Sequence, residues 1–576
     1  MDVVHVTHEA IEKIGGIGTV IEGLCSAKGY QALSGRTVLF GPYWEMDHPL
    51  EHSFEGGEML YHSREKRDGK WGDVFAPIEA EFGVDVIYGH RILREPYAGA
   101  EAEAEVLLLD VRGMNPEPVN AAKAILWETY GIPSDRHEAV WDYEQFVRLG
   151  AAGLSALRAI GIAAGEKTVI LAHEFMGMPT ALLAKQDDPE TIRTIFYAHE
   201  VASVRPVVEK HPGHDTMFYA AMEAATAEGK TLAEVFPEVE DNFKHPLVAA
   251  SHYCDGIFAV GHYVQKELHF LDPTFPSDRI TLSYNALASE ELTPAQREKS
   301  ATALRDYSKR ILGLSPTWIF THVARPVLSK GIWRDFGVLH ELDARLGERG
   351  ETAVFYILGT LGGVRSKAQV EEMAAAYGWP ANHVEGYPDV CNGEEGISVL
   401  CEAFNASHHN IRAVLVNQWG WSAKALGAAA GEMTIEDLRE GADVEFGMSV
   451  YEPFGISPLE PLTYGAICVV SNVCGCVGLI EASGAETVPN VLIGDFLLPE
   501  SGKPLRECLE CTTSDRDAVE AVELARLAGE LDLRLPRTQA DRDAILSAGY
   551  ALAHRMNWDT LVAERIAPAL KRLWTE

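Results

Sequence analysis

Short apolar runs rich in valine, isoleucine, leucine and phenylalanine recur along the chain and alternate with amphipathic, helix-like segments. Runs this short indicate buried strands, and their alternation with helices indicates parallel sheets that carry helices on both faces. Because the runs fall into two sets, we predict an α/β protein with two Rossmann-like doubly wound domains. The predicted strands are 3–7, 37–40, 84–88, 106–111, 169–172, 194–197, 256–260 and 280–283 in the first set, and 318–323, 354–358, 413–416, 444–448, 467–471 and 491–493 in the second.

The length of 576 residues is too great for one domain and suits two or three. A polar, helical stretch from 289 to 310 separates the two sets of strands. Ligands of doubly wound sheets bind beyond the carboxyl ends of the strands, so we expect the motifs of both domains to face a cleft. Two polar segments, 206–246 and 362–442, are expected to be insertions. The expected domains are 1–290 on the N-terminal, acceptor side, 291–555 as the nucleotide-binding domain, and 556–576 as a helix that crosses back to the first.

Composition limits the partners and the compartment. A formal net charge of −36 repels phosphate backbones, which argues against nucleic acid, and no apolar run approaches the roughly eighteen residues of a membrane span. The first residues enter a strand-like run without the basic region of a secretion signal, and the nine scattered cysteines suit a reducing, cytoplasmic setting. The spacing of Cys474-x-Cys476 is poor for zinc, and no histidine pair flanks it or Cys508-x2-Cys511, so no metal is expected. A homo-oligomer stays open.

The segment 444–478 holds the most specific motif. An apolar strand leads into a turn that contains Glu452 and Gly455, and a helix is expected to begin near Pro458, just before Glu460. Free N–H groups at a helix start attract phosphate, while a neighbouring carboxylate accepts sugar hydroxyls. By spacing alone, the two glutamates also fit an ordinary strand–turn–helix. With its Pro-Phe-Gly, Pro-Leu-Glu and Tyr-Gly-Ala elements, the segment resembles the nucleotide-sugar signature of retaining glycosyltransferases of the two-Rossmann-domain (GT-B) type.

A glycine-rich turn, KIGGIGTV, follows the first predicted strand and contains Lys13, Gly15, Gly16 and Gly18. Such a turn lets backbone N–H groups approach a phosphate at a helix start, although a tight turn alone also explains the glycines. Its spacing fits the dinucleotide fingerprint poorly, which disfavours a dehydrogenase. The longer run HEAIEKIGGIGTVIEGL resembles the start of glycogen and starch synthases, and its continuation is nearer to the animal and fungal glycogen synthases.

Two His-Glu pairs end consecutive predicted strands, at His173-Glu174 and at His199, with Arg205 six residues after the second histidine. A single histidine at a strand end is more often a core or cap residue, but two such pairs in succession weaken that interpretation. The pattern resembles glycogen synthases, except that Phe175 stands in place of the usual tryptophan. The resemblance implies that Glu174 binds ligand, that His199 lies by the donor hexose and that Arg205 reaches a phosphate.

Arg325 and Lys330 lie on one loop after the first strand of the second set. An arginine fork and a lysine point charge at this spacing suit a diphosphate, although a solvated basic loop is the plainer interpretation. The pair resembles the Arg-x4-Lys-Gly element of glycogen synthases, which implies that both cations hold the leaving diphosphate.

The resemblance covers about residues 1–560 and implies a retaining glucosyltransferase that moves glucose from UDP- or ADP-glucose to an α-1,4-glucan without a cofactor or metal. It implies that His199, Arg325, Lys330 and Glu452 are catalytic, with Gly455 beside the hexose and Glu460 on the ribose. One alternative is a related GT-B transferase that makes a small glycoside or disaccharide. Another is a catalytically silent protein that binds nucleotide sugars.

Overall fold

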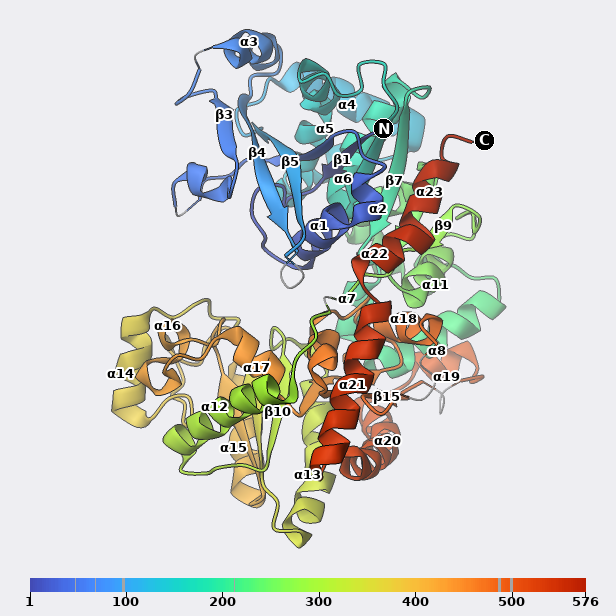
Figure 1. The fold of residues 1–576 in the computed structure, drawn as a ribbon. Helices are drawn as coiled ribbons and strands as arrows, with labels where there is room; N and C mark the ends of the chain where they lie inside the picture. Colours follow the sequence, from blue (N-terminus) through green and yellow to red (C-terminus); the bar gives the residue numbers. More distant parts are fainter. Residues whose placement is uncertain are drawn as a thin grey trace. The chain divides into compact units, whose positions relative to one another are not determined.

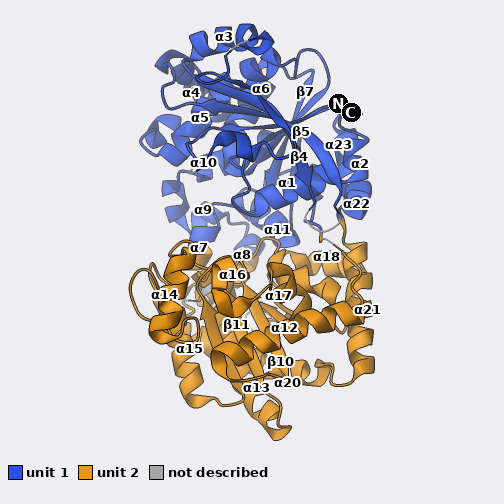
Figure 2. Ribbon diagram, turned by 60° about the vertical axis from the view of Figure 1, so that its left-hand side comes forward, with its two compact units in different colours: residues 1–207, 225–286, 558–576 blue, residues 208–224, 287–557 orange. Residues whose placement is uncertain are grey.

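The computed structural model describes residues 1–46, 48–67, 69–95, 99–211, 213–287, 289–484, 488–497 and 501–575. The chain divides into two compact units, shown in Figure 2. Unit 1 comprises residues 1–207, 225–286 and 558–576, and unit 2 comprises residues 208–224 and 287–557. Two helices, α7 (Arg205–Lys210) and α8 (His214–Ala227), contain the points where the chain first leaves unit 1 and first returns to it; it leaves again after residue 286 and returns at residue 558.

Unit 1 is built on a nine-stranded sheet in the order β3-β4-β5-β2-β1-β6-β7-β8-β9, with helices packed around it (Figure 1). Seven neighbouring strands of the sheet run parallel, in the order β5-β2-β1-β6-β7-β8-β9. Its strands are β1 (Asp2–Val6), β2 (Thr37–Pro42), β3 (Glu58–His62), β4 (Asp85–Arg94), β5 (Glu101–Asp110), β6 (Thr168–His173), β7 (Ile192–Ala198), β8 (Gly256–Ala259) and β9 (Ile280–Leu282). Its helices include α1 (Gly16–Ser26), α2 (Lys28–Gln31), α3 (Lys70–Phe82), α4 (Pro116–Tyr130), α5 (Trp141–Ala159), α6 (Glu174–Asp187), α9 (Leu232–Val235), α10 (His245–Ala249), α11 (His262–Leu271), α22 (Trp558–Leu561) and α23 (Ala567–Arg572).

One edge of this sheet differs from the predicted parallel arrangement, because β4 runs antiparallel to both β3 and β5. The connection between β4 and β5 spans only residues 95–100, whereas a parallel crossover needs about a dozen residues or more. The strand β3 was absent from the prediction. Its sequence, EMLYH, is short and starts with an exposed glutamate, so it lacks the continuous apolar run of a central parallel strand.

Unit 2 is built on a six-stranded parallel sheet in the order β12-β11-β10-β13-β14-β15. This is the 3-2-1-4-5-6 order of a doubly wound fold, and its topological switch point lies between β10 and β13. The strands are β10 (Trp318–Val323), β11 (Ala353–Leu358), β12 (Ile411–Val416), β13 (Val444–Gly447), β14 (Ile467–Ser471) and β15 (Val491–Gly494). The helices include α12 (Pro294–Leu312), α13 (Ile332–Glu348), α14 (Lys367–Tyr377), α15 (Glu395–Ser407), α16 (Ala423–Leu426), α17 (Ile435–Gly441), α18 (Cys476–Ala482), α19 (Leu505–Leu509), α20 (Thr513–Arg534) and α21 (Gln539–Arg555).

The segment 362–442 is not the insertion that its polar sequence suggested. Its strand β12 pairs with β11 along the whole of both strands, from Ala353–Ile411 to Leu358–Val416, and its helix α15 packs against β12. The polar composition reflects edge position and exposed helix faces. The segment therefore completes the doubly wound sheet of unit 2.

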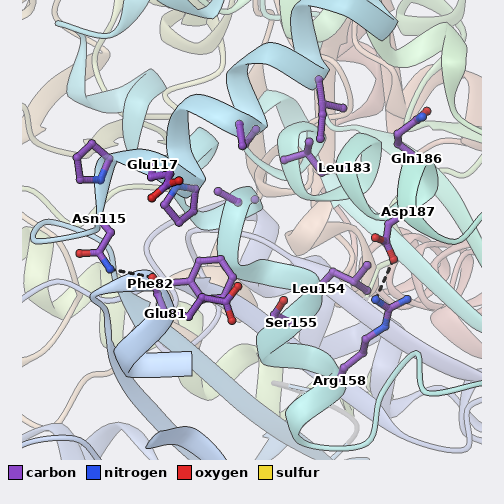
Figure 3. Close-up of a pocket in the computed structure, with 17 residues that line it drawn as sticks. Glu81, Phe82, Asn115, Glu117, Leu154, Ser155, Arg158, Leu183, Gln186 and Asp187 are labelled. Atoms are coloured by element: carbon purple, nitrogen blue, oxygen red, sulfur yellow. Dashed lines mark hydrogen bonds and ion pairs between the residues drawn. The ribbon is translucent and has the colours of Figure 1, made fainter. Parts of the chain in front are cut away.

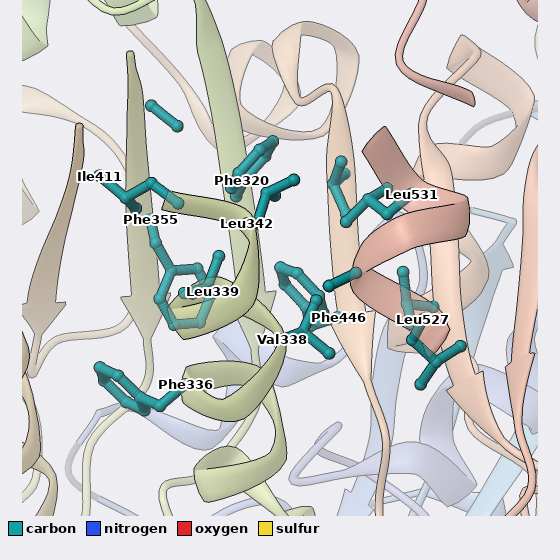
Figure 4. Packing of buried hydrophobic residues seen from close by; sticks show 14 of the residues in the cluster. Phe320, Phe336, Val338, Leu339, Leu342, Phe355, Ile411, Phe446, Leu527 and Leu531 are labelled. Carbon is teal, nitrogen blue, oxygen red and sulfur yellow. The ribbon is translucent and has the colours of Figure 1, made fainter. Parts of the chain in front are cut away.

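The core of unit 2 explains why β10, β11 and β13 are so apolar. Phe446 packs edge to face against Phe320 and Phe355, at ring-centroid distances of 6.2 and 5.6 Å. Leucines and a valine from α13 and α20 cover these rings (Figure 4). Burying each such side chain contributes about 1.5–3 kcal/mol, so this layer fixes the position of the strand ends above it.

Local signals set the helix boundaries around this core. Thr293, Thr512 and Thr538 each cap a helix of unit 2 and form a capping box with the third residue of that helix. The helix α12 ends at Gly313, which adopts the left-handed conformation typical of a C-terminal glycine. None of the described helices is long and apolar enough to cross a membrane.

Candidate functional site

The loop after β10 and the turn after β13 lie at the switch point of unit 2 and are joined by their backbones. The N–H groups of Val450 and Tyr451 donate to the Ser329 carbonyl at 2.8 and 3.3 Å. Gly331 closes the loop with φ +62°, and a Cβ there would lie 2.3 Å from the Met448 carbonyl oxygen. Only glycine fits this close approach, so the backbone places residue 330 against the turn that contains residue 452.

Lys330 and Glu452 form an ion pair, in which Lys330 Nζ donates to Glu452 Oε2. Both side chains are half-buried, and Ser449 Oγ donates to the same carboxylate oxygen at 3.3 Å. A lysine ammonium has three N–H donors, so it can keep this carboxylate and hold a further anion. The pair thus sets a cation and a hydroxyl acceptor side by side at the point where ligands of this fold bind.

A second loop holds the turn from the other side. Gly475 N donates to the Glu452 carbonyl at 3.0 Å and Cys476 N donates to the Phe454 carbonyl at 2.8 Å. A Cβ at Gly475 would lie 1.8 Å from the Pro453 oxygen, so the two backbones are in direct contact. Gly455 has φ +89°, the left-handed region that favours glycine. The turn that carries Glu452 is therefore fixed on both sides before any ligand binds.

Glu460 lies in η7 (Ser457–Tyr464), which is a 3₁₀-helix, and Arg439 of α17 binds it. Arg439 Nη2 also donates to Ser457 Oγ at 2.8 Å, and its Nη1 lies 3.2 Å from Glu445 Oε2. Sequence reasoning missed Arg439 and Glu445. The signal was a glutamate inside the buried strand β13, which needs a partner cation.

Arg325 shares the loop with Lys330, since both follow β10, but its side chain is exposed. The loop and turn that flank the switch point of unit 2 contain Arg325, Lys330, Glu452 and Gly455, and η7, which follows the turn, contains Glu460.

In unit 1, the carboxyl ends of β6 and β7 bring His173 and His199 together. Their rings stack at 14° with centroids 5.1 Å apart, and His173 Nδ1 lies 2.8 Å from His199 Nε2. His173 Nε2 lies 2.9 Å from Nδ1 of His5 in β1, a residue that sequence reasoning missed. Burial lowers the pKa of His5 and of His199 to about 3, and it lowers the pKa of His173 well below the usual value. The three rings are therefore neutral at pH 7.

Glu174 begins α6 with φ +58°, an uncommon conformation for a residue with a side chain. Its Oε1 accepts the Glu200 N–H at 2.7 Å, while its buried Oε2 has no hydrogen-bond partner among the described residues. Burial, reinforced by the nearby Glu200 carboxylate, raises the pKa of Glu174 well above its usual value. Arg205 Nε donates to Glu200 Oε2 at 2.5 Å, so this arginine holds the carboxylate that lies near Glu174.

The glycine-rich turn is organised by Glu9, a buried residue that sequence reasoning did not select. Its Oε2 accepts N–H groups from Ile14, Gly15 and Gly18 at 3.0, 2.8 and 2.9 Å. A Cβ at Gly18 would lie 2.7 Å from this oxygen, which explains the glycine there. Lys13 is exposed and pairs with Glu22 at 3.1 Å. Three of the N–H groups expected to approach a phosphate are thus already bound to a carboxylate.

A pocket of about 910 Å³ lies elsewhere in unit 1, among α4, α5, α6 and the end of α3 (Figure 3). Phe82, Leu154 and Leu183 line it, and Arg158 pairs with Asp187 across its edge at 2.8 Å. It lies in the helical layer and is lined by none of the predicted site residues. Its position argues against a role as the main ligand site, because doubly wound sheets bind ligands beyond their strand ends.

No protein-family model and no curated protein sequence matches the chain. Solved structures do match. A UDP-forming α,α-trehalose-phosphate synthase from Burkholderia xenovorans superposes with a TM-score of 0.50 at 12% identity, covering 100% of both chains. A synthase of the same description from Burkholderia vietnamiensis gives 0.50 at 12% identity, covering 100% of this chain and 99% of the other. At such identity the likeness concerns the fold, which is the GT-B fold of two parallel-sheet α/β domains.

Proposed function

We propose that the protein is a retaining glucosyltransferase that moves glucose from UDP-glucose or ADP-glucose to the non-reducing end of an α-1,4-glucan. The observation that carries this proposal is the Lys330–Glu452 pair at the switch point of a doubly wound sheet. The GT-B fold and the order of the sequence motifs support it.

The difficult step is cleavage of the bond between C1 of glucose and the diphosphate oxygen, as negative charge builds on the leaving diphosphate. Lys330 stabilises that charge from a position that the backbone has already fixed, and Arg325 adds a second cation from the same loop. Such preorganised charges act strongly because they need no rearrangement during the reaction. Glu452, held against Lys330, accepts hydrogen bonds from hydroxyl groups of the hexose. One ion pair therefore contacts both the diphosphate and the glucose, the two groups that the breaking bond joins.

Glu460 accepts the ribose hydroxyls of the nucleotide. Arg439 binds its Oε2 and leaves the second carboxylate oxygen to the ligand. In the same proposal, His199 binds a hexose hydroxyl and Arg205 a phosphate, as the resemblance to glycogen synthases implies. The glycine-rich turn contributes N–H groups that Glu9 does not occupy.

A second candidate is a transferase that makes a small disaccharide product. It is favoured by the names of the two matched structures, both trehalose-phosphate synthases. The donor chemistry is the same in the two candidates, so only the acceptor separates them.

The test is a matrix of nucleotide sugars and acceptors with the purified chain. UDP-glucose, ADP-glucose and GDP-mannose are each combined with glycogen, maltoheptaose, glucose 6-phosphate or no acceptor, and release of nucleoside diphosphate is measured. We expect release with a glucose donor and glycogen, and an α-linked product by NMR. Release with glucose 6-phosphate alone selects the second candidate. A protein that binds donors but releases nothing with any acceptor refutes both.

A further inference from the structure

We propose that Tyr30, His5 and His173 form a directional hydrogen-bond relay that holds His199 with its proton on Nε2, leaving Nδ1 as the ring's hydrogen-bond acceptor. Tyr30, His5 and His173 are then positioning residues for His199. The relay stands on the geometry of unit 1 alone, while the role of its free nitrogen in sugar binding rests on the proposed function.

The relay is continuous and joins three strands and one helix. The Tyr30 hydroxyl of α2 lies 2.9 Å from His5 Nε2, and His5 Nδ1 lies 2.9 Å from His173 Nε2. His173 Nδ1 lies 2.8 Å from His199 Nε2. Each of these distances is that of a good hydrogen bond, and His5, His173 and Tyr30 are all buried. No ring nitrogen of His5 or His173 remains for another strong partner.

Because a neutral imidazole carries one N–H and one bare nitrogen, each ring in the relay must donate on one side and accept on the other. The three rings are neutral at pH 7, as their lowered pKa values indicate. The proton positions of all three rings are therefore linked. One group at the far end decides whether every ring carries its proton on Nε2 or every ring carries it on Nδ1.

At the Tyr30 end of the relay, a backbone carbonyl fixes the direction of the hydrogen bonds. Ser34 Oγ donates to the Arg36 carbonyl at 2.9 Å, and a carbonyl can only accept. Ser34 has a single hydroxyl proton, so in its 2.9 Å contact with Thr37 Oγ1 it must accept. Thr37 then donates to Ser34, and in its 3.2 Å contact with Tyr30 the threonine oxygen must accept.

The donor and the acceptor of every other hydrogen bond in the relay are then determined. Tyr30 donates to Thr37, so its oxygen accepts from His5 Nε2–H. His5 Nδ1 is bare and accepts from His173 Nε2–H, and His173 Nδ1 accepts from His199 Nε2–H. The opposite direction would set the Tyr30 and Thr37 oxygens against each other without a proton between them.

Cys25 also lies near the relay, with its sulfur 3.7 Å from His5 Nε2. Its thiol favours the opposite direction if it donates to this nitrogen. A thiol is a weak donor, and the Tyr30 oxygen is much closer, so the hydroxyl end determines the direction.

The consequence concerns what His199 recognises. A bare Nδ1 accepts a hydrogen bond from a hydroxyl group and repels the lone pairs of a carbonyl or phosphate oxygen. The relay therefore makes His199 selective for a ligand hydroxyl, the group that a sugar supplies.

Proton positions are measured by NMR of protein labelled with ¹⁵N in histidine only, at pH 7, with assignments from single His→Gln variants. Pyrrole-type frequencies mark a protonated ring nitrogen and pyridine-type frequencies a bare one. We expect His5, His173 and His199 all to show pyrrole-type Nε2 and pyridine-type Nδ1. A protonated Nδ1 in His199 overturns the proposal.

Variants at the far end test the direction. Thr37→Val removes the acceptor of the Tyr30 hydroxyl and frees Tyr30 to donate to His5, so the His199 proton should move to Nδ1. Tyr30→Phe removes the acceptor of His5 Nε2–H and should bring a mixture of the two tautomers. The matched control is Tyr143→Phe, which removes another buried tyrosine hydroxyl, bound to Ser134 at 2.9 Å, outside the relay. A wild-type His199 spectrum in a folded Thr37→Val protein contradicts the relay, whatever Tyr30→Phe does.

The spectra and the transfer assay separate the two proposals. A protein with the expected tautomers but no glucosyl transfer keeps the relay and loses the proposed function. An active protein with a protonated Nδ1 in His199 keeps the function and loses the relay.

Discussion

In each unit taken by itself, candidate site residues hold their charges as ion pairs, although the chain is strongly acidic. Lys330 binds Glu452, Arg439 binds Glu460, and Arg205 binds Glu200. Each pair is at least partly buried. Each cation is therefore fixed in position, and bulk water screens its charge only in part. Under the proposed function, this pairing would let a protein with a net charge of −36 present defined cations to an anionic donor.

The first prediction concerns the two cations of the loop after β10. Lys330→Ala and Arg325→Ala should each lower turnover by roughly 10²–10³-fold, as expected when a preorganised charge is removed from a transition state. The control is Lys367→Ala, which removes an exposed lysine of α14 in the same unit. Single-turnover rates with a saturating donor provide the measurement. Turnover close to wild type in either folded variant means that this loop does not hold the diphosphate.

The second prediction separates the two carboxylates. Glu452→Gln keeps the shape but loses a charged acceptor for the hexose, so it should damage transfer severely and leave binding of free nucleoside diphosphate largely intact. Glu460→Gln should mainly weaken binding through the ribose and appear as a raised KM. Calorimetric affinity for UDP or ADP, together with kcat and KM, distinguishes the two. If Glu452→Gln instead weakens nucleotide binding and spares turnover, the two roles are wrongly assigned.

At the scale of elements, two loops joined by their backbones create the site of unit 2, and glycine makes this possible. Gly331→Ala should place a methyl group 2.3 Å from the Met448 carbonyl, in addition to the strain of φ +62°. Gly313→Ala is the matched control, because it has φ +70° but meets no atom within 4 Å. Both variants should lose about 1–2 kcal/mol of unfolding free energy from the left-handed backbone. Because of the contact with Met448, Gly331→Ala should lose more unfolding free energy than Gly313→Ala and should also lower turnover. Urea unfolding and the transfer assay measure the two effects. Equal effects of the two would mean that the loops are not in contact.

A buried carboxylate, Glu394, should make the stability of unit 2 depend on pH. Burial alone raises the pKa of Glu394, but hydrogen bonds from Arg365, Thr360 and the Gly362 N–H outweigh it and lower the pKa from 4.5 to about 2. The ionised form is therefore favoured by folding. Its stabilisation is fully present above pH 4.5 and is lost as the pH falls towards 2, a loss of about 3 kcal/mol in total.

The measurement is urea unfolding at a series of pH values, for the wild type and for Glu394→Gln. The variant should be less stable at pH 7, and the difference should shrink as the pH falls below 4.5. Glu402→Gln changes an exposed carboxylate of α15 and serves as the control. A difference between wild type and Glu394→Gln that stays constant down to pH 3 would contradict the assignment.

The elements show which parts of the structure can be predicted from the sequence. The central parallel strands and the loops after β10 and β13 were predictable, because continuous apolar runs and short motifs are local signals. The strand β3 was not, since it is short, lies at a sheet edge and starts with an exposed glutamate. The strand β12 was predicted, but the polar segments on either side of it made 362–442 look like an insertion. Partners such as His5, Glu9 and Arg439 were also missed, because their contacts join segments far apart in the sequence.

At the scale of the whole molecule, the path of the chain matters most. Residues 558–576 follow the whole of unit 2 in sequence but belong to unit 1. They are held there by specific contacts: the Lys28 N–H donates to Asp559 Oδ1 at 2.8 Å, and Arg193 Nε donates to the Leu573 carbonyl at 3.1 Å. Unit 1 is therefore completed only by the last part of the chain.

The last prediction tests this dependence through Trp558. Its indole fills the space that Gly23 leaves in α1, where a Cβ would lie 1.9 Å from Trp558 Nε1. Trp558→Ala should therefore destabilise unit 1 by about 3–5 kcal/mol, the range for removing a buried aromatic side chain. Trp127→Ala is the matched control: Trp127 is 60% exposed in the same unit, whereas Trp558 is 6% exposed, so the control should change stability by no more than about 0.5 kcal/mol. Hydrogen exchange followed by mass spectrometry locates the effect. Exchange should accelerate in peptides from β1, β6 and β7 and stay unchanged in β10 to β15, because Gly23, against which Trp558 packs, lies in unit 1. Equal acceleration in both sheets would mean that the end of the chain stabilises the whole molecule and not unit 1 alone.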